Sequence, residues 1–202
     1  MDKTRPKSAL TDVAWVQTTR GEKTVRDTLA HAHTLPLDVT SQDAVTVGAT
    51  LRLLTHLAAV VVRLDPDSVE TGQFNADAVD AAINTVGDCA LLGGDTGFLH
   101  VRGSDDLTAQ QRSLRRLSPA LHPVSALNFW DRSTLNPHTL TPEEAVRALV
   151  AYNTAFPTGN NKLNGVKCRA NGPAIYGSAA GGAITIEAWV TGENLHDTLL
   201  MN

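Results

Sequence analysis

The chain has 202 residues, of which 42% are hydrophobic and 19% charged, and this is enough apolar material to bury a core as one domain or one and a half. A net charge of −4 excludes a protein that coats nucleic acid with its whole surface, so any binding of a polyanion is confined to a local patch. The chain has no signal-peptide pattern, no apolar run of the roughly 18 residues that a membrane span needs, and two cysteines far apart. We therefore expect a soluble, cytoplasmic protein without structural disulfides.

The chain is predicted to open with a β-hairpin and a short helix. Two β-prone runs, Val13 to Val16 and Lys23 to Val25, flank a glycine-containing turn. Apolar periodicity then predicts an amphipathic helix from Thr24 to about His33. His31 and His33 on that helix lie two residues apart and therefore on different faces, so we interpret them as surface histidines and not as a metal site.

A long core helix is predicted next, capped by Ser41-Gln42-Asp43 and running to about Leu64. His56 lies among its aliphatic residues and is expected to be a packed or surface residue and not a catalyst. Asp65-Pro66-Asp67 ends the helix because the residue before a proline is disfavoured in the α region, and a loop is expected to follow.

Three further elements are predicted before the middle of the chain. A helix from about Phe74 is expected to close near Gly93-Gly94, with Cys89 in its buried end. Phe98 to Val101 reads as a short strand, and Leu107 to Leu117 as a helix that carries three arginines.

Prolines and asparagines predict an irregular loop from Pro119 to Thr141. Phe129 and Trp130 are adjacent in this loop and lie beside Arg132. Such a pair can stack on a nucleic-acid base or plug a neighbouring protein. It can equally close the domain's own core, so the residue types leave these alternatives open.

The last third of the chain carries strong helix signals. Thr141-Pro142-Glu143-Glu144 predicts a capping box, with a helix that runs to about Asn153. Ala183 to Val190 alternates like a strand. Thr191 to Asn194 begins a final helix that continues to Met201 and is expected to lack a C-terminal cap, so we expect a longer protein or a partner to cover that end.

Between these elements lies the glycine-rich segment, residues 156–182. It has no Asp or Glu between Pro157 and Gly182, whereas Lys162, Lys167 and Arg169 are basic. Its six glycines and four asparagines favour turns and make a regular helix or strand unexpected, so an exposed loop that binds an anion is predicted. From composition alone, a surface connection that binds no ligand is the simpler interpretation.

No catalytic pattern accompanies these elements. The Gly-Gly-Asp-Thr-Gly run at 93–97 lacks the GK[ST] ending of a phosphate loop and the second Asp-Thr-Gly of an aspartic protease. The metalloprotease, α/β-hydrolase and paired-carboxylate patterns are missing, and Cys168 has no histidine near it in the sequence. We therefore expect no enzymatic activity, no metal and no cofactor.

The chain contains Pro123–Ser125 with Phe129–Ser133, Leu140–Leu149, the glycine-rich segment and Val190–Asn202. In that order, these segments resemble the CasA family, the large subunits of type I-E CRISPR Cascade complexes. The resemblance covers essentially the whole chain and implies an α+β fold of mixed helices, short β-hairpins and long irregular loops. It implies that residues 1–202 are a single globular N-terminal domain of a larger subunit, whose C-terminal helical bundle lies outside this sequence.

The resemblance also implies a function. Subunits of this family are non-catalytic, recognise the protospacer-adjacent motif on double-stranded DNA and contact the 5′ handle of the guide RNA. The partners implied are the double-stranded DNA target, the CRISPR guide RNA, the other Cascade subunits and, through the full-length subunit, a helicase–nuclease. The competing hypothesis is a structural or protein-interaction domain whose glycine-rich segment docks a partner subunit.

Two groups of site residues follow from the resemblance. The loop of Asn128, Phe129, Trp130 and Arg132 corresponds to the one that meets the guide handle and the motif DNA. The family often has consecutive glycines where this chain continues with asparagines and a lysine, so no motif preference can be transferred. The expected DNA-binding residues are Gly159, Asn160, Asn161, Lys162 and Lys167.

Overall fold

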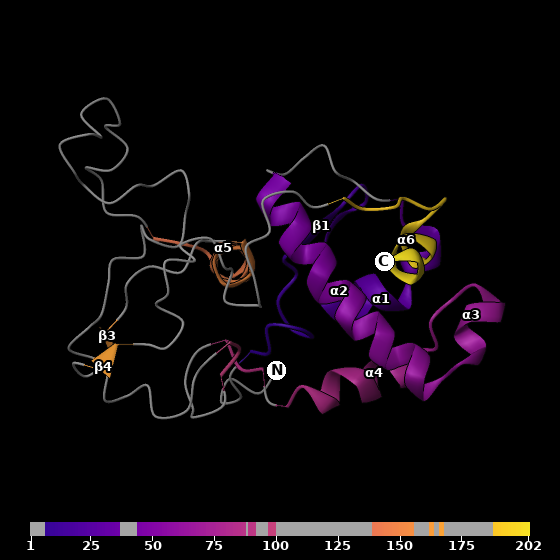
Figure 1. The fold of residues 1–202 in the computed structure, drawn as a ribbon, viewed down its shortest axis with the longest axis horizontal. Helices are drawn as coiled ribbons and strands as arrows, with labels where there is room; N and C mark the ends of the chain where they lie inside the picture. Colours follow the sequence, from indigo (N-terminus) through magenta and orange to yellow (C-terminus); the bar gives the residue numbers. More distant parts are fainter. Residues whose placement is uncertain are drawn as a thin grey trace. The chain divides into compact units, whose positions relative to one another are not determined.

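The computed structural model describes residues 7–36, 44–87, 89–91, 97–99, 139–155, 162–163, 166–167 and 188–202. The chain divides into two compact units, of which unit 1 comprises Met1–Arg102 and Ile186–Asn202 and unit 2 comprises Gly103–Thr185. Among the described residues, helices predominate and the strands form two separate two-stranded antiparallel sheets (Figure 1). The predicted α+β class is confirmed.

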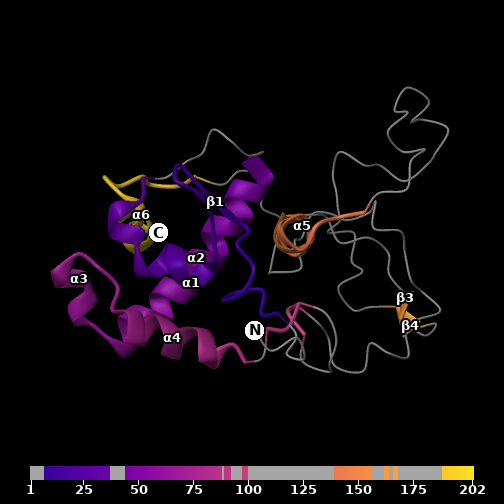
Figure 2. The same cartoon turned by 180° about the vertical axis from the view of Figure 1, so that it is seen from behind.

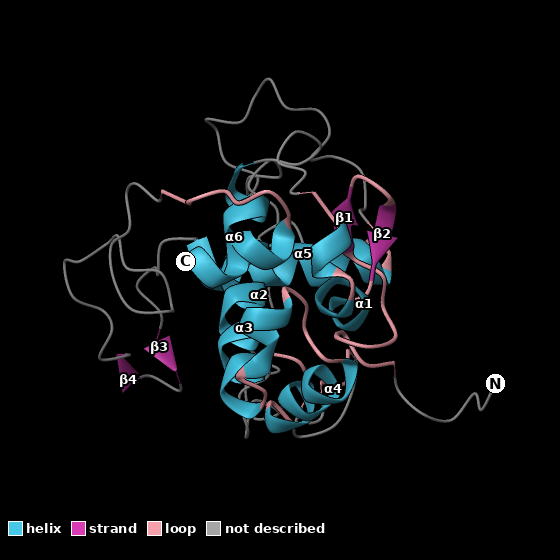
Figure 3. Cartoon of the chain, turned by 90° about the vertical axis from the view of Figure 1, so that its right-hand side faces the viewer, coloured by secondary structure: helices cyan, strands magenta, loops and turns pink. Residues whose placement is uncertain are grey.

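The opening hairpin of unit 1 precedes its first helix (Figure 3). β1 (Val16–Thr18) pairs antiparallel with β2 (Gly21–Lys23), and Gly21 takes up a φ of +92° at the turn. The predicted hairpin is confirmed, but its first strand begins three residues later than expected. Trp15 lies before β1, where it is fully buried and donates a hydrogen bond from Nε1 to the carbonyl of Ala9 at 2.8 Å.

The first helix is shorter than predicted. α1 (Val25–Ala30) begins after Thr24, whose hydroxyl accepts a backbone N–H of the first turn at 3.0 Å. The helix ends at His31, and the 3₁₀ turn η1 (Ala32–Thr34) takes the place of the predicted last turn. Ala32 is fully buried, so this turn brings an additional residue into the core.

Two exposed histidines, His31 and His56, make local backbone contacts. His31 and His56 are exposed, and their Nδ1 atoms lie 2.9 and 2.7 Å from a carbonyl one turn earlier in the chain. Both are surface residues as predicted, whereas His33 is half-buried. In the part of the chain that the structure describes, no group of three or more His, Cys, Asp or Glu could hold a metal ion.

The core helix of unit 1 is α2 (Ala44–Leu64), which confirms the predicted helix over its described length. It packs against α1, α3, α4 and α6, and the two opposite views show it crossing the unit among them (Figures 1 and 2). The expectation that no apolar run reaches the length of a membrane span is wrong, because α2 is long and apolar enough. Its inner face is buried against the other helices, which is the behaviour of a core helix in a soluble protein. The buried residues of that face include Leu51, Leu54, Leu57, Ala58 and Val61.

A short helix, α3 (Asp67–Thr71), stands where a loop was predicted after α2. Pro66 has the helical dihedral angles φ −61° and ψ −26°, so it ends α2 and at the same time starts α3. Ser68 anchors α3, because it is 1% exposed and its hydroxyl donates to the carbonyl of Asp65 at 2.7 Å.

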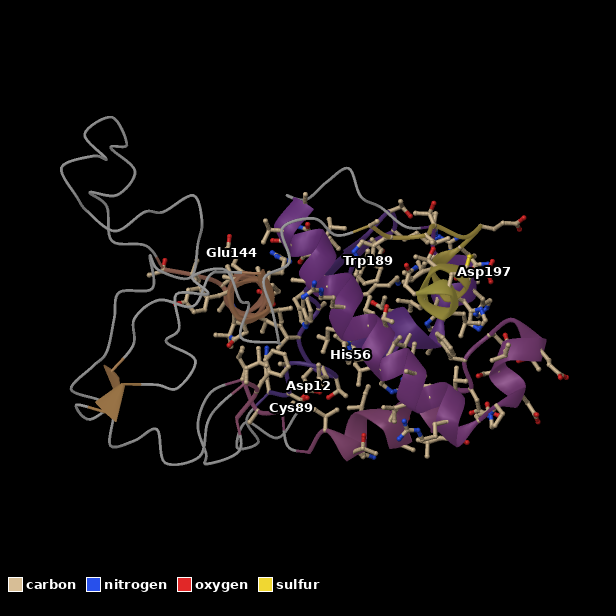
Figure 4. All side chains as sticks on the ribbon, in the orientation of Figure 1. Asp12, His56, Cys89, Glu144, Trp189 and Asp197 are labelled. Carbon is tan, nitrogen blue, oxygen red and sulfur yellow. The ribbon has the colours of Figure 1, made fainter. Side chains whose placement is uncertain are left out.

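The next helix, α4 (Ala76–Thr85), ends well before the predicted glycine pair at 93–94. Gly87 has a φ of +87° and terminates it, because a residue in that conformation cannot continue a helix. Cys89 is buried as predicted, but it lies beyond the helix, and its carbonyl accepts the N–H of Ala9 at 2.8 Å. Cys89 is labelled in Figure 4.

The strand predicted from Phe98 is not found in its described part. Phe98 and Leu99 form a turn, and Leu99 has a φ of 56°, which a strand does not accommodate. The N–H of Phe98 donates to the carbonyl of Ala90 at 2.8 Å, so the buried Phe98 is fixed by a local backbone bond. Ala188 to Val190, at the end of the other predicted strand, also has no strand structure.

Unit 1 is completed by α6 (Leu195–Met201), which packs against α2 and η1 and follows its predicted limits. The expectation of an uncapped C-terminus is wrong. The side-chain amide of Asn202 donates to the carbonyls of Thr198 and Val190, both at 2.7 Å, and its oxygen accepts the N–H of Val190 at 3.0 Å. This side chain therefore caps the helix and ties it to the preceding segment.

Among the buried polar residues that the structure describes in unit 1, His196 has the largest side chain and is 1% exposed. Its ring lies 4.5 Å from the ring of Phe74, and its two nitrogens face Asp197 Oδ1 at 3.4 Å and the carbonyl of Ser68 at 3.2 Å. Because it joins α6 to α3 through these contacts, His196 is a packing residue.

Unit 2 is described by one helix and one hairpin. α5 (Pro142–Ala155) has the predicted start and extends two residues beyond the predicted end. β3 (Lys162–Leu163) pairs antiparallel with β4 (Val166–Lys167). The predicted features that lie outside the described residues are the Ser41–Asp43 cap, the 107–117 helix, the loop up to residue 138 and the strand over 183–187.

Candidate nucleic-acid interface

Two hydrogen bonds fix the start of α5, the helix that precedes the glycine-rich segment. The N–H of Glu144 donates to Thr141 Oγ1 at 3.2 Å, and Glu144 Oε2 accepts the N–H of Thr141 at 2.9 Å. This reciprocal pair is the predicted capping box, which satisfies two backbone donors that the helix leaves without partners. Figure 4 marks Glu144 in this first turn of α5.

One face of α5 is buried and the helix stops next to the glycine-rich segment. Val146, Val150 and Ala151 are at most 4% exposed, whereas Tyr152 is 37% exposed. Near the end of the helix, the Asn153 amide donates to the carbonyl of Leu149 at 2.9 Å. Since α5 ends at Ala155 and the glycine-rich segment begins at the next residue, α5 fixes the point where that segment starts.

The glycine-rich segment contains a strand pair that the sequence analysis did not predict. Lys162 is the cross-strand partner of Lys167, and Leu163 is the partner of Val166. In the sequence, the two strands are separated by Asn164-Gly165, the dipeptide most typical of two-residue hairpin turns. This local signal was available, but the high glycine and asparagine content of the whole segment obscured it.

The structure therefore brings together two of the expected DNA-binding residues, Lys162 and Lys167. The other three, Gly159, Asn160 and Asn161, lie outside the described residues. The predicted contact loop also lies outside them, and its residues are Asn128, Phe129, Trp130 and Arg132.

The charges are distributed unevenly between the two units. Unit 1 contains 9 Lys and Arg and 16 Asp and Glu, a net charge of −7, whereas unit 2 contains 8 and 5, a net charge of +3. These two values add to the −4 of the whole chain. Whole-chain charge thus concealed a basic unit, and the unit boundaries reveal it. A polyanion is attracted by unit 2 and repelled by unit 1.

In the described part of unit 1, a pair of oppositely charged side chains connects two helices. Arg26 on α1 and Asp80 on α4 form a two-pronged ion pair, with Nε to Oδ1 at 2.5 Å and Nη2 to Oδ2 at 2.7 Å. The hydrogen bond from Arg26 lowers the pKa of Asp80, and the bond to Asp80 raises the pKa of Arg26. The pair connects two packed helices and is half-exposed.

The C-terminal motif that contributed to the family resemblance is also structural. Asn194 caps α6 by accepting the N–H of Asp197 at 2.9 Å, and Leu195 and Leu199 are buried. Thr198 is fully buried, and its hydroxyl accepts the N–H of Gly192 at 3.0 Å. These positions explain the Gly-Glu-Asn-Leu-x-x-Thr-Leu-Leu pattern by packing and capping, so they identify a family without marking a site.

The fold and the charge distribution define the class of protein: an α+β protein with an acidic helical unit and a basic unit that carries the glycine-rich segment. The chain belongs to the CRISPR-associated protein Cse1 family, whose model matches residues 10–202. Cse1 is another name for CasA, so the family expected from the sequence is confirmed. The chain is therefore a subunit of a type I-E CRISPR Cascade complex, in a family of non-catalytic subunits, and other Cascade subunits are its partners. No curated protein and no solved structure matches the chain.

Proposed function

We propose that this chain recognises the protospacer-adjacent motif on double-stranded DNA, contacts the 5′ handle of the guide RNA and catalyses no reaction itself, within a cytoplasmic Cascade complex. The observation that carries the proposal is the acid-free, basic glycine-rich segment that starts directly after the capped helix α5, in a chain of the Cse1 family. As in the family, the longer subunit would also recruit a helicase–nuclease.

Gly159, Asn160 and Asn161 have the chemistry that minor-groove reading needs. The minor groove of B-DNA is only about 6 Å wide, so a backbone with few side chains enters it more deeply than a bulky one. Asparagine amides can donate to the acceptors that line the groove floor. Because the groove presents similar acceptors for different base pairs, such reading tolerates more than one motif.

The charge distribution supports an oriented approach of the nucleic acid. Phosphate groups are drawn to the net +3 of unit 2 and repelled by the net −7 of unit 1. Within unit 2, Phe129 and Trp130 beside Arg132 supply aromatic faces and a cation for an unpaired base, as a single-stranded RNA handle offers. We assign Asn128 to the same contact loop.

The experiment uses the assembled complex with guide RNA and two duplex targets, one with the adjacent motif and one with it scrambled. Gly159→Leu should reduce the ratio of the two affinities, because a bulky side chain blocks approach to the groove floor. Asn161→Ala should weaken binding of the motif-bearing duplex by about 1 to 3 kcal/mol, the cost of leaving a buried partner without its hydrogen bond. Asn84→Ala, at an exposed position on α4, is the matched control and should leave both affinities unchanged.

The competing function is docking of a partner subunit by the glycine-rich segment. Under that hypothesis, Gly159→Leu impairs assembly and leaves the affinity ratio of the assembled fraction unchanged. An unchanged ratio in a complex that still assembles would therefore reject motif reading by this segment.

A further inference from the structure

The β3–β4 hairpin places two like charges at one register position. Lys162 and Lys167 are cross-strand partners, next to the pair of Leu163 and Val166. Directly opposed residues of an antiparallel pair have Cα atoms about 4.5 to 5.5 Å apart and share one face of the hairpin. The register therefore brings two basic residues that are five positions apart in the sequence to the same position along the hairpin.

This arrangement weakens the hairpin. Each strand has only two residues, and an isolated two-stranded hairpin is marginally stable in water. Like charges at directly opposed register positions destabilise an antiparallel pair further. An anion that contacts both lysines would turn their destabilising effect on the hairpin into a stabilising one.

The local sequence supplies no such anion. From Pro157 to Gly182 there is no Asp or Glu, although the segment contains three basic residues. Lysine makes its strong hydrogen bonds to carboxylates and phosphates, so the counter-charge for this position comes from another molecule or from a distant part of the protein. In a complex that holds nucleic acid, phosphate is the most abundant anion.

We propose that Lys162 and Lys167 act together as a phosphate clamp on the backbone of the target duplex, and that binding stabilises the hairpin. The inference rests on the proposed function. Lys162 follows Asn161 directly, and a strand advances by about 3.3 Å per residue. Residues that enter a minor groove only about 6 Å wide are thus followed at once by the hairpin, and phosphates border that groove on both sides.

A clamp predicts a different mutational pattern from two independent contacts. Two independent lysines each remove about one unit from the slope of log affinity against log salt when they are replaced, so the double change removes about two. A clamp on one phosphate loses about one unit in either single variant and about one in the double variant. The single variants should bind both duplexes about tenfold more weakly, the size expected for one charge-assisted hydrogen bond.

The experiment measures salt-dependent affinity of the assembled complex for duplexes with the motif present or scrambled, using Lys162→Gln, Lys167→Gln and the double variant. Lys23→Gln is the matched control, because Lys23 also ends a hairpin strand but has Val16 as its cross-strand partner. Lys162→Arg and Lys167→Arg keep the charge and should retain the wild-type slope. Equal slopes in the two single variants and the double variant support the clamp.

Lys162→Glu separates phosphate binding from a role in hairpin stability alone. This change creates an opposite-charge pair with Lys167 and strengthens the hairpin. If the lysines only shape the hairpin, Lys162→Glu should bind DNA at least as well as Lys162→Gln. If they clamp a phosphate, it should bind more weakly, because a carboxylate repels the backbone.

Three results would overturn the clamp: additive loss of slope in the double variant, wild-type affinity in all glutamine variants, or reduced binding of guide RNA with unchanged binding of DNA. Motif reading is tested by the ratio of affinities for the two duplexes, whereas the clamp is tested by the slope that both duplexes share. A failed clamp with an intact ratio leaves the proposed function in place. If Gly159→Leu leaves the ratio of the two affinities unchanged in the assembled complex, the proposed function is rejected, whatever the result for the clamp.

Discussion

Replacing Gly192 by alanine tests the way in which the C-terminal segment packs onto α6. A Cβ atom at this position would clash with Asp197 Cβ and would lie 2.8 Å from Met201 Cε and 2.9 Å from the backbone nitrogen of Thr198. The methionine methyl can move, but the other two atoms belong to the first turn of a packed helix. Relief therefore requires the segment before α6 to move away from the helix.

The cost has two parts. Overpacking of this kind typically destabilises a protein by about 1 to 3 kcal/mol. Displacement of the segment also breaks the 3.0 Å hydrogen bond from the Gly192 N–H to Thr198 Oγ1, which contributes roughly 0.5 to 1.5 kcal/mol. We expect Gly192→Ala to lower the free energy of unfolding by about 2 to 4 kcal/mol.

The assay is urea unfolding of the chain, followed by tryptophan fluorescence, with the midpoint and the slope fitted together. Met201→Ala in the Gly192→Ala background should restore little stability, because it removes only one of the three close contacts. Asn84→Ala on the exposed side of α4 serves as a control for surface changes. A loss below about 0.5 kcal/mol, the usual range of surface substitutions, would refute the close approach of Gly192 to α6.

Two further predictions concern charged groups. The pKa of Asp80 is lowered in the folded chain, so the stability contributed by its pair with Arg26 is present at neutral pH and decreases as the pH falls through the folded pKa; the raised pKa of Arg26 affects only strongly alkaline pH. Because both side chains are about 40% exposed, we expect Asp80→Asn to lower the free energy of unfolding by less than about 1 kcal/mol at pH 7. The difference in stability from wild type should become smaller in acid, and an undiminished difference at pH 3 would contradict this assignment. Glu144→Ala should destabilise the first turn of α5 by about 0.5 to 1 kcal/mol, because the Thr141 N–H loses its acceptor. We expect faster amide hydrogen exchange at Thr141 than in wild type, and unchanged exchange would refute the prediction.

Signals between near neighbours in the sequence were predictive in this chain. The capping box of Thr141 and Glu144 and the start of α6 at Asn194 were both found where expected. Each depends on a side chain that bonds the backbone about three residues away, so the interaction is complete within one helical turn. The Asn164-Gly165 hairpin signal is equally local, and it was missed only because the surrounding composition predicted a loop.

Tertiary structure decided which of several glycines ends α4. The sequence offers Gly87 and the pair at 93–94, and each can adopt the left-handed conformation. Gly87 does so because the following residues leave the helix to pair with the start of the chain. In that pairing, Ala9 donates to the carbonyl of Cys89 and Leu91 donates to the carbonyl of Lys7, both at 2.8 Å. The partners are about eighty residues apart in the sequence, and no local pattern reports such a contact.

The sequence by itself determined the family, the α+β class, the core helix and the basic character of the glycine-rich segment, since these depend on residue type and short-range order. Only the tertiary structure decided that Lys162 and Lys167 are cross-strand partners in a hairpin, that the net charge divides into an acidic and a basic unit, and that Gly192 is needed for close packing against α6. The physical reason is that these properties depend on which distant atoms meet. A linear pattern gives the chemistry of each residue, whereas register and packing set its neighbours.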